Sequence, residues 1–148
     1  MARTRKLSFE TTLLVRDCCL CLHMQRAARN LARLFDDALR DLDLTNGQFS
    51  LLMSLNRPQP PAMKAVSSLL AMDRTTLTAA LKPLERRGLV RIEPDPDDRR
   101  SRLLILTPDG QQLLAEAFPI WQRMHAEIEK PFAPGEIERL RRQLRALS

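Results

Sequence analysis

Glycine and histidine are scarce in this chain, which has four glycines and two histidines among 148 residues. No glycine-rich loop that could cradle a nucleotide phosphate is present, and no serine, histidine and acid stand at a recognisable catalytic spacing. The two histidines, His23 and His125, fall on separate predicted helices. The sequence therefore argues against an enzyme and predicts no cofactor.

Long hydrophobic runs are also missing, since no apolar run reaches the roughly 18 residues that a membrane-spanning helix needs. The segment from Met1 to Phe9 is basic but lacks the apolar block of a secretory signal. The three cysteines, Cys18, Cys19 and Cys21, are too close together and odd in number for a secreted disulfide framework. We therefore expect a cytoplasmic protein without a membrane partner.

Positive charge is the first feature that points to a partner. Hydrophobic residues make up 44% and charged residues 28% of the chain, a composition typical of a folded domain rather than a disordered segment. The net charge of +6 favours polyanionic partners, because each neutralised phosphate releases counterions. Charge also serves solubility, so the positions of the cations must decide whether they bind nucleic acid.

The N-terminal part reads as two helices. Residues 11–42 contain no proline or glycine and carry apolar residues at three- and four-residue steps, which predicts one long amphipathic helix. Thr45 and Gln48 have the spacing of a capping box, so a second helix is expected to begin there. The proline-rich stretch 57–61 should end that helix.

Two short helices joined by a tight turn follow, the pattern of a helix-turn-helix. Residues 63–71 form the first of these helices, and residues 72–73 form the turn. Asp73 is the expected N-cap of the second helix, which is ended by Gly88. Its inner face consists of Leu77, Leu81 and Leu84.

A β-hairpin and two further helices complete the predicted fold. Residues 89–92 and 102–106 favour strands, and residues 93–101 form a charged, exposed tip between them. Thr107 and Pro108 begin a long helix that extends to about residue 128, with a kink expected at Pro119. A last helix follows Pro131. The predicted fold is mostly α with a small β-hairpin wing, that is, a winged helix-turn-helix with helices at both ends.

The outer face of the second short helix is the candidate DNA-reading surface. A threonine can bond a base edge and pack its methyl group on thymine, and an arginine can bind guanine with two hydrogen bonds. The hairpin tip adds cations that could reach a neighbouring groove. The candidate DNA contacts are Arg74, Thr75, Thr76, Thr78, Lys82, Arg99, Arg100 and Arg102. The alternatives are a solvated helix face and a winged helix that binds only other proteins.

Four runs, residues 69–78, 84–90, 97–102 and 106–110, resemble the winged-helix signature of the MarR (multiple antibiotic resistance regulator) family. The resemblance implies a single MarR-like domain over residues 1–148, with the DNA-binding part at 45–107 and helical dimerisation parts at 11–42 and 108–148. It implies a sequence-specific transcriptional regulator, usually a repressor, that binds double-stranded DNA as a homodimer on a palindromic operator. A small aromatic or amphipathic effector would bind between the dimerisation helices and the winged domain.

The resemblance also assigns roles to single residues. The aspartate-x-arginine of the family's wing corresponds to Asp98 and Arg100, with the arginine in a minor groove and the aspartate supporting the wing by pairing with Arg74. Two departures stand out. Ala71 occupies a turn position where glycine is common, and Pro83 should perturb the second half of the recognition helix, which ranks Lys82 behind the threonines.

Apolar stripes at both chain ends predict the dimer, because one small winged domain has little core to cover them. Packing within one chain is expected to account for some of these side chains. The stripes include Leu13, Leu14, Leu140, Leu144 and Leu147.

The cysteine cluster has three interpretations. The first is redox sensing. Cys21 falls at the position of the peroxide-sensing thiol when the chain is aligned with the MarR-like organic hydroperoxide regulators, and Cys19 is a second redox candidate. The phenolic partners of that site cannot be present, because the chain has no tyrosine. Activation would then come from Arg16, His23 or Arg26. A second interpretation is packing near the dimer interface, which is the commonest role of helix cysteines. A third is a metal site across a dimer, because Cys18 and Cys21 would share one helix face and Cys19 and His23 another.

Overall fold

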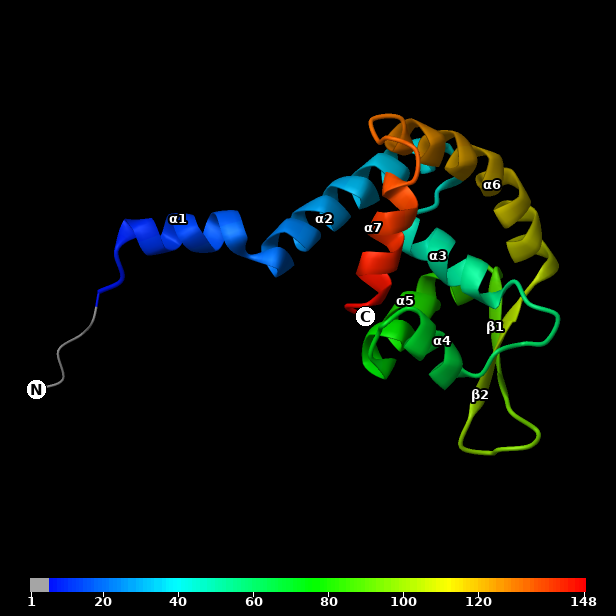
Figure 1. Ribbon diagram of the computed structural model, residues 1–148. Helices are drawn as coiled ribbons and strands as arrows, with labels where there is room; N and C mark the ends of the chain where they lie inside the picture. Colours follow the sequence, from blue (N-terminus) through cyan, green and yellow to red (C-terminus); the bar gives the residue numbers. More distant parts are fainter. Residues whose placement is uncertain (1–5) are drawn as a thin grey trace, which may run out of the picture.

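The computed structural model describes residues 6–148, so the first five residues of the basic N-terminal segment lie outside the described part. It confirms the predicted fold class, a mostly helical chain with one two-stranded hairpin (Figure 1). The elements in chain order are α1 (Phe9–Cys18), α2 (Leu20–Ala38), the 3₁₀ helix η1 (Arg40–Leu42), α3 (Asn46–Leu55), α4 (Met63–Leu69), α5 (Arg74–Arg86), β1 (Val90–Pro94), β2 (Arg102–Leu106), α6 (Pro108–Glu129) and α7 (Glu136–Arg145).

The single helix predicted over residues 11–42 is wrong. The chain leaves helical geometry at Cys19, where ψ is 106°, and α2 begins at the next residue. Periodicity predicts helical conformation but not continuity. No residue of α1 is buried, so packing within residues 6–148 does not hold α1 in line with α2. Figure 1 shows α1 projecting away from the rest of the molecule. The break also puts Cys18 and Cys21 on different helices, so the helix face that they were expected to share does not exist.

Helix α3 occupies the centre of the fold. The predicted capping box is present: the Gln48 backbone N–H donates to the Thr45 hydroxyl at 3.1 Å, and the Thr45 N–H donates to the Gln48 side chain at 3.0 Å. The helix packs against α2, α4, α6 and β2. Side chains that are almost completely buried around it form one core. They are Leu39, Leu51, Leu52, Val66, Leu77, Leu81, Leu84, Val90 and Leu104.

The helix-turn-helix forms as predicted from α4 and α5. Asp73 caps α5 by accepting a hydrogen bond from the Thr76 N–H at 2.7 Å. In the turn before it, Ala71 has a φ of +51°, the left-handed conformation that favours glycine. Helix α5 continues through Pro83 to Arg86, and Gly88 follows with a φ of +71°. The perturbation expected after Pro83 therefore does not end the helix.

The hairpin pairs Val90 with Leu106 at its base and Pro94 with Arg102 near its tip. Its first strand begins one residue later and extends two residues further than predicted. The proline-rich segment before α4 joins this sheet, because the Leu104 N–H donates to the Pro61 carbonyl at 2.9 Å and an isolated bridge joins Ala62 to Leu103. The start of α4 is therefore fixed against the wing.

The last two helices return over the other side of α3. Thr107 caps α6 through the Gly110 N–H at 3.1 Å, with Pro108 at the first helical position as predicted. Helix α6 runs unbroken through Pro119 and curves over the top of the molecule in Figure 1. An ion pair between Glu129 and Arg141 fixes α7 to its end. None of the helices in residues 6–148 is long and apolar enough to cross a membrane.

Candidate nucleic-acid interface

The exposed face of α5 carries the predicted reading residues, but their hydroxyl groups differ. The Thr76 hydroxyl donates to Asp73 at 2.9 Å, and the Thr78 hydroxyl donates to the Arg74 carbonyl at 2.7 Å. Both therefore use their hydrogen inside the protein and keep only acceptor lone pairs and a methyl group for a ligand. For the Thr75 hydroxyl no partner is found among residues 6–148, so it can both donate and accept.

Asp73 places a fixed negative charge at the start of this face. Its carboxylate accepts hydrogen bonds from the backbone N–H and the hydroxyl of Thr76, and these bonds lower the pKa of Asp73 below its usual range. The carboxylate stays ionised, and it holds the first turn of α5 in place. Asp73 thus shapes the reading face by fixing its first turn.

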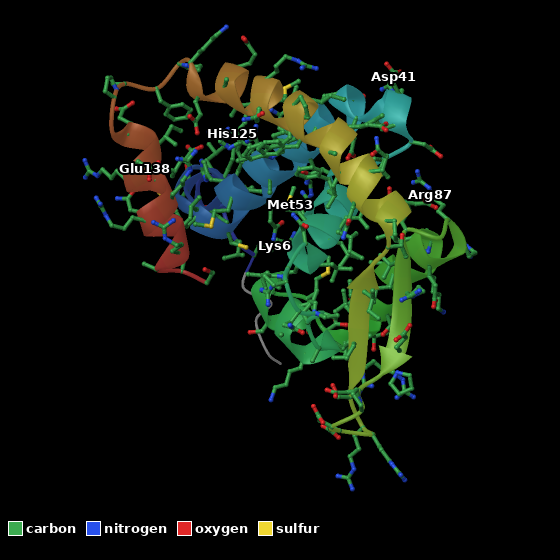
Figure 2. The ribbon with its side chains drawn as sticks, turned by 90° about the vertical axis from the view of Figure 1, so that its right-hand side faces the viewer. Lys6, Asp41, Met53, Arg87, His125 and Glu138 are labelled. Carbon is green, nitrogen blue, oxygen red and sulfur yellow. The ribbon has the colours of Figure 1, made fainter. Side chains whose placement is uncertain are left out.

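The wing tip is built by backbone turns that its aspartates stabilise. The Asp97 N–H donates to the Asp95 side chain at 2.9 Å, and the Arg100 N–H donates to the Asp98 side chain at 3.0 Å. Arg99, Arg100 and Arg102 are all exposed. Figure 2 shows the hairpin projecting well beyond the body of the molecule, with charged side chains around its tip.

Between the wing and the helix-turn-helix lies a cleft of about 310 Å³. Four cations and one carboxylate line it: Lys64, Arg74, Arg100, Arg102 and Asp98, together with Met63, Ser67 and Ser101. The structure thus brings Arg74, Arg100 and Arg102 together, whereas Thr75, Thr76, Thr78, Lys82 and Arg99 lie outside the cleft. Within the described chain no ion pair joins Asp98 to Arg74, so the pairing expected from the family resemblance is not formed. Asp98 supports the wing through its turn instead.

Sequence reasoning missed two residues, one at this cleft and one at the C-terminal end of α5. Lys64 sits on α4, the first helix of the motif, and it faces the wing only because residues 61–62 join the sheet. Arg87 follows α5 and donates to the Asp43 carbonyl at 2.6 Å and to the Leu42 carbonyl at 3.4 Å. Arg87, labelled in Figure 2, thereby ties the end of the recognition helix to the segment between α2 and α3. Neither contact has a local signal, since each joins residues far apart in sequence.

A second cavity, of about 400 Å³, lies between α3, α4 and α6. Its lining contains no charged side chain: Phe49, Ser50, Met53, Ser54, Leu69, Leu70, Phe118 and Trp121. Trp121 stacks on Phe118 with ring centres 5.9 Å apart and on Phe49 at 6.3 Å. The cavity therefore has an aromatic wall suited to a flat, apolar ligand.

The cysteines surround the break between α1 and α2. Cys18 and Cys21 are exposed and Cys19 is half-buried. The Gln25 amide donates to the Cys21 sulfur at 3.2 Å, whereas the Arg16 guanidinium is paired with Asp17 at 2.6 Å and is not directed to a thiol. No group of three potential metal ligands gathers among the residues that the structure describes.

The arrangement of α4, α5 and wing matches known proteins. A sequence model of the MarR family matches residues 44–101, which run from the start of α3 to the wing tip. The organic hydroperoxide resistance transcriptional regulator of Bacillus subtilis (strain 168) is 31% identical over 101 residues, which are 68% of this chain and 69% of that protein. This chain belongs to the MarR family. This chain spans about two thirds of the length of the curated relatives that it matches.

Solved structures extend the match to the helices outside the winged domain. The M. tuberculosis transcriptional regulator MosR, solved in complex with DNA, has 35% sequence identity to this chain and a TM-score of 0.79. The match covers 87% of this chain and 92% of the MosR chain. Bordetella bronchiseptica BpsR, solved in a study of how 6-hydroxynicotinic acid regulates its DNA binding, has 27% identity and a TM-score of 0.78, with 86% and 91% covered. The fold of α2, α6 and α7 is therefore also that of MarR regulators.

Proposed function

We propose that this MarR-family chain is a transcriptional regulator that binds double-stranded DNA in a sequence-specific manner as a homodimer. The observation that carries the proposal is the surface on which the exposed face of α5, the wing arginines and a cleft with four cations adjoin one another. Helix α5 would enter the major groove, and Arg100 would reach the adjacent minor groove. MosR has been solved in complex with DNA, which supports DNA as the partner. We expect such a regulator to act in the cytoplasm, and catalysis is no part of the proposal.

The helices at the two ends of the chain would form the dimer. Leu14 and Leu147 keep 61% and 62% of their surface exposed, and Leu140 and Leu144 keep 40% and 43%. A second copy related by a two-fold axis would cover these side chains and set the spacing of two α5 helices on a palindrome. Residues 11–42 and 108–148 are then the dimerisation part, and residues 45–107 are the reading part.

An effector would act through the aromatic cavity between α3, α4 and α6. Its lining has no charge and three aromatic rings, which favours a small aromatic or amphipathic molecule. The regulation of BpsR by 6-hydroxynicotinic acid is consistent with a ligand of this class. A ligand that separates α4 from α6 would tilt α5 and release DNA, the response expected of a repressor.

Oxidation of Cys21 is a second route to the same response. Cys21 is exposed near the start of α2 and accepts a hydrogen bond from Gln25, and the related Bacillus subtilis regulator is named for organic hydroperoxide resistance. A Cys21 thiolate would attack the O–O bond of a hydroperoxide, becoming a sulfenic acid and releasing an alcohol. With stoichiometric cumene hydroperoxide, DNA binding should fall for wild type and Cys19→Ser but not for Cys21→Ser. An equal response of Cys21→Ser would leave the cysteines with a packing role.

A binding-site selection from random double-stranded DNA tests the core of the proposal. The full-length protein should enrich one palindromic sequence, and its affinity for that sequence should fall steeply with salt. The alternative is a winged helix that serves only as a protein-interaction module. That protein would enrich no sequence.

A further inference from the structure

We infer that the cleft between α4 and the wing is a seat for one phosphate of the DNA backbone, and that Lys64 is its third anchor beside Arg74 and Arg102. The inference rests on the proposed DNA binding and deepens it. It adds α4 to the two elements, α5 and the wing, that are expected to touch DNA. It also assigns to Lys64 a role that is independent of base sequence.

The charge of the cleft favours an anion. Four cationic side chains line it, and Asp98 is its only carboxylate. One oxygen of that carboxylate already accepts the Arg100 N–H, and no ion pair within 4.0 Å forms to any of the four cations in residues 6–148. Cations held together without counter-charges repel one another, and a phosphodiester is the anion that a DNA-binding surface meets.

The position of the cleft favours backbone over bases. Its cations come from three different elements: Lys64 from α4, Arg74 from the first turn of α5, and Arg100 and Arg102 from the wing. The threonines that could read base edges lie outside it. Ser67 also lines the cleft, but its hydroxyl donates to the Met72 carbonyl and so stabilises the turn instead. Contacts of cations to phosphate fix position without carrying sequence information.

Lys64 is held at the cleft by the fold rather than by its own contacts. Its neighbour Met63 is buried, and Ala62 forms the bridge to Leu103 of the wing. The backbone of Lys64 is therefore fixed against the hairpin, while its side chain is exposed. An anchor of this kind would set the angle of the wing to α5 when all three elements hold the same phosphate.

The test is the salt dependence of DNA binding by full-length variants, measured by fluorescence anisotropy on the selected sequence and on a scrambled duplex. Lys64→Ala should lower the slope of log affinity against log salt by about 2, one for each protomer of the dimer, and weaken both duplexes several-fold at low salt. Lys64→Arg should keep the wild-type slope, because it keeps the charge. Lys130→Ala is the matched control: Lys130 pairs with Glu127 at the end of α6, on the side of the molecule opposite the wing (Figure 1).

The outcomes separate the two levels of the proposal. A wild-type slope for Lys64→Ala, or a changed consensus in binding-site selection with this variant, would overturn the phosphate seat alone. A wild-type protein that shows no salt-dependent binding to any duplex would overturn the proposed function and the seat with it. An unchanged melting temperature of Lys64→Ala shows that any loss of affinity does not come from unfolding.

Discussion

At the scale of single residues, hydrogen bonding divides threonines that look equivalent in the sequence. The Thr76 hydroxyl donates to Asp73 and the Thr78 hydroxyl donates to the Arg74 carbonyl, whereas the Thr75 hydroxyl donates to no group among residues 6–148. A base with only acceptors at the relevant edge could therefore be read by Thr75 but not by the other two through a hydroxyl donor. The methyl groups of Thr76 and Thr78 remain available to thymine.

Ala71 is a residue at which the chain carries backbone strain. A left-handed conformation costs an L-residue about 1–2 kcal/mol, and a glycine would remove this cost while adding about 0.5–1 kcal/mol of backbone entropy. Ala71→Gly should therefore raise the free energy of unfolding by about 0.5–1 kcal/mol, as measured by urea denaturation. Ala65→Gly, inside α4, is the matched control and should lower it by about 1 kcal/mol. Equal losses from both variants would show that the turn is not strained.

At the scale of elements, local chemistry made much of the fold predictable. The caps at Thr45, Asp73 and Thr107 each bond a backbone N–H three residues away, so their spacing is visible in the sequence. The buried face of α5 follows from helical periodicity in the same way. What could not be predicted depends on distant contacts. The Arg87 contact spans 44 residues, and Lys64 joins the cleft through a bridge to the wing.

The prediction of one continuous helix through Cys19 failed for a different reason. Neither proline nor glycine marks the break, the amide of Cys19 still bonds the Val15 carbonyl at 2.9 Å, and the chain turns at Cys19, where ψ is 106°. Because α1 buries no side chain in the described part of the chain, packing does not set its direction, and hydrophobic periodicity cannot predict it. Consequently the helix face inferred for Cys18 and Cys21 was also wrong.

The wing is an element whose function can be separated from its stability. The Arg100 side chain is exposed, and the hydrogen bond that shapes the turn uses its backbone, so Arg100→Ala should leave the melting temperature nearly unchanged. Affinity for the selected DNA should fall by about 1–3 kcal/mol, measured by anisotropy. Arg91→Ala, on the same hairpin but paired with Glu93 at 3.3 Å, should lose less. If the two variants bind equally well, the tip does not contact DNA.

At the scale of the whole molecule, the exposed leucines at both ends predict that the protein functions as a pair. The double variant Leu14→Glu, Leu147→Glu should become a monomer of 17.0 kDa in light scattering, because charges would replace the apolar contacts. Binding to a palindrome should weaken by roughly a hundredfold or more as avidity is lost. Thr12→Glu adds a charge to the exposed side of the same helix and should remain a dimer. A double variant that still dimerises would place the interface on other helices.

The fluorescence of Trp121 can report ligand binding in the aromatic cavity. The chain has one tryptophan and no tyrosine, so ultraviolet emission excited at the red edge arises from a single side chain in the cavity wall. That indole stacks on Phe49 and on Phe118, and the His125 ring lies 4.7 Å from it on the same helix. Any molecule that enters between α3 and α6 must displace solvent from this fluorophore or alter its stacking. Ligand screening can therefore follow intrinsic emission of the unlabelled protein, without knowing which DNA sequence it binds.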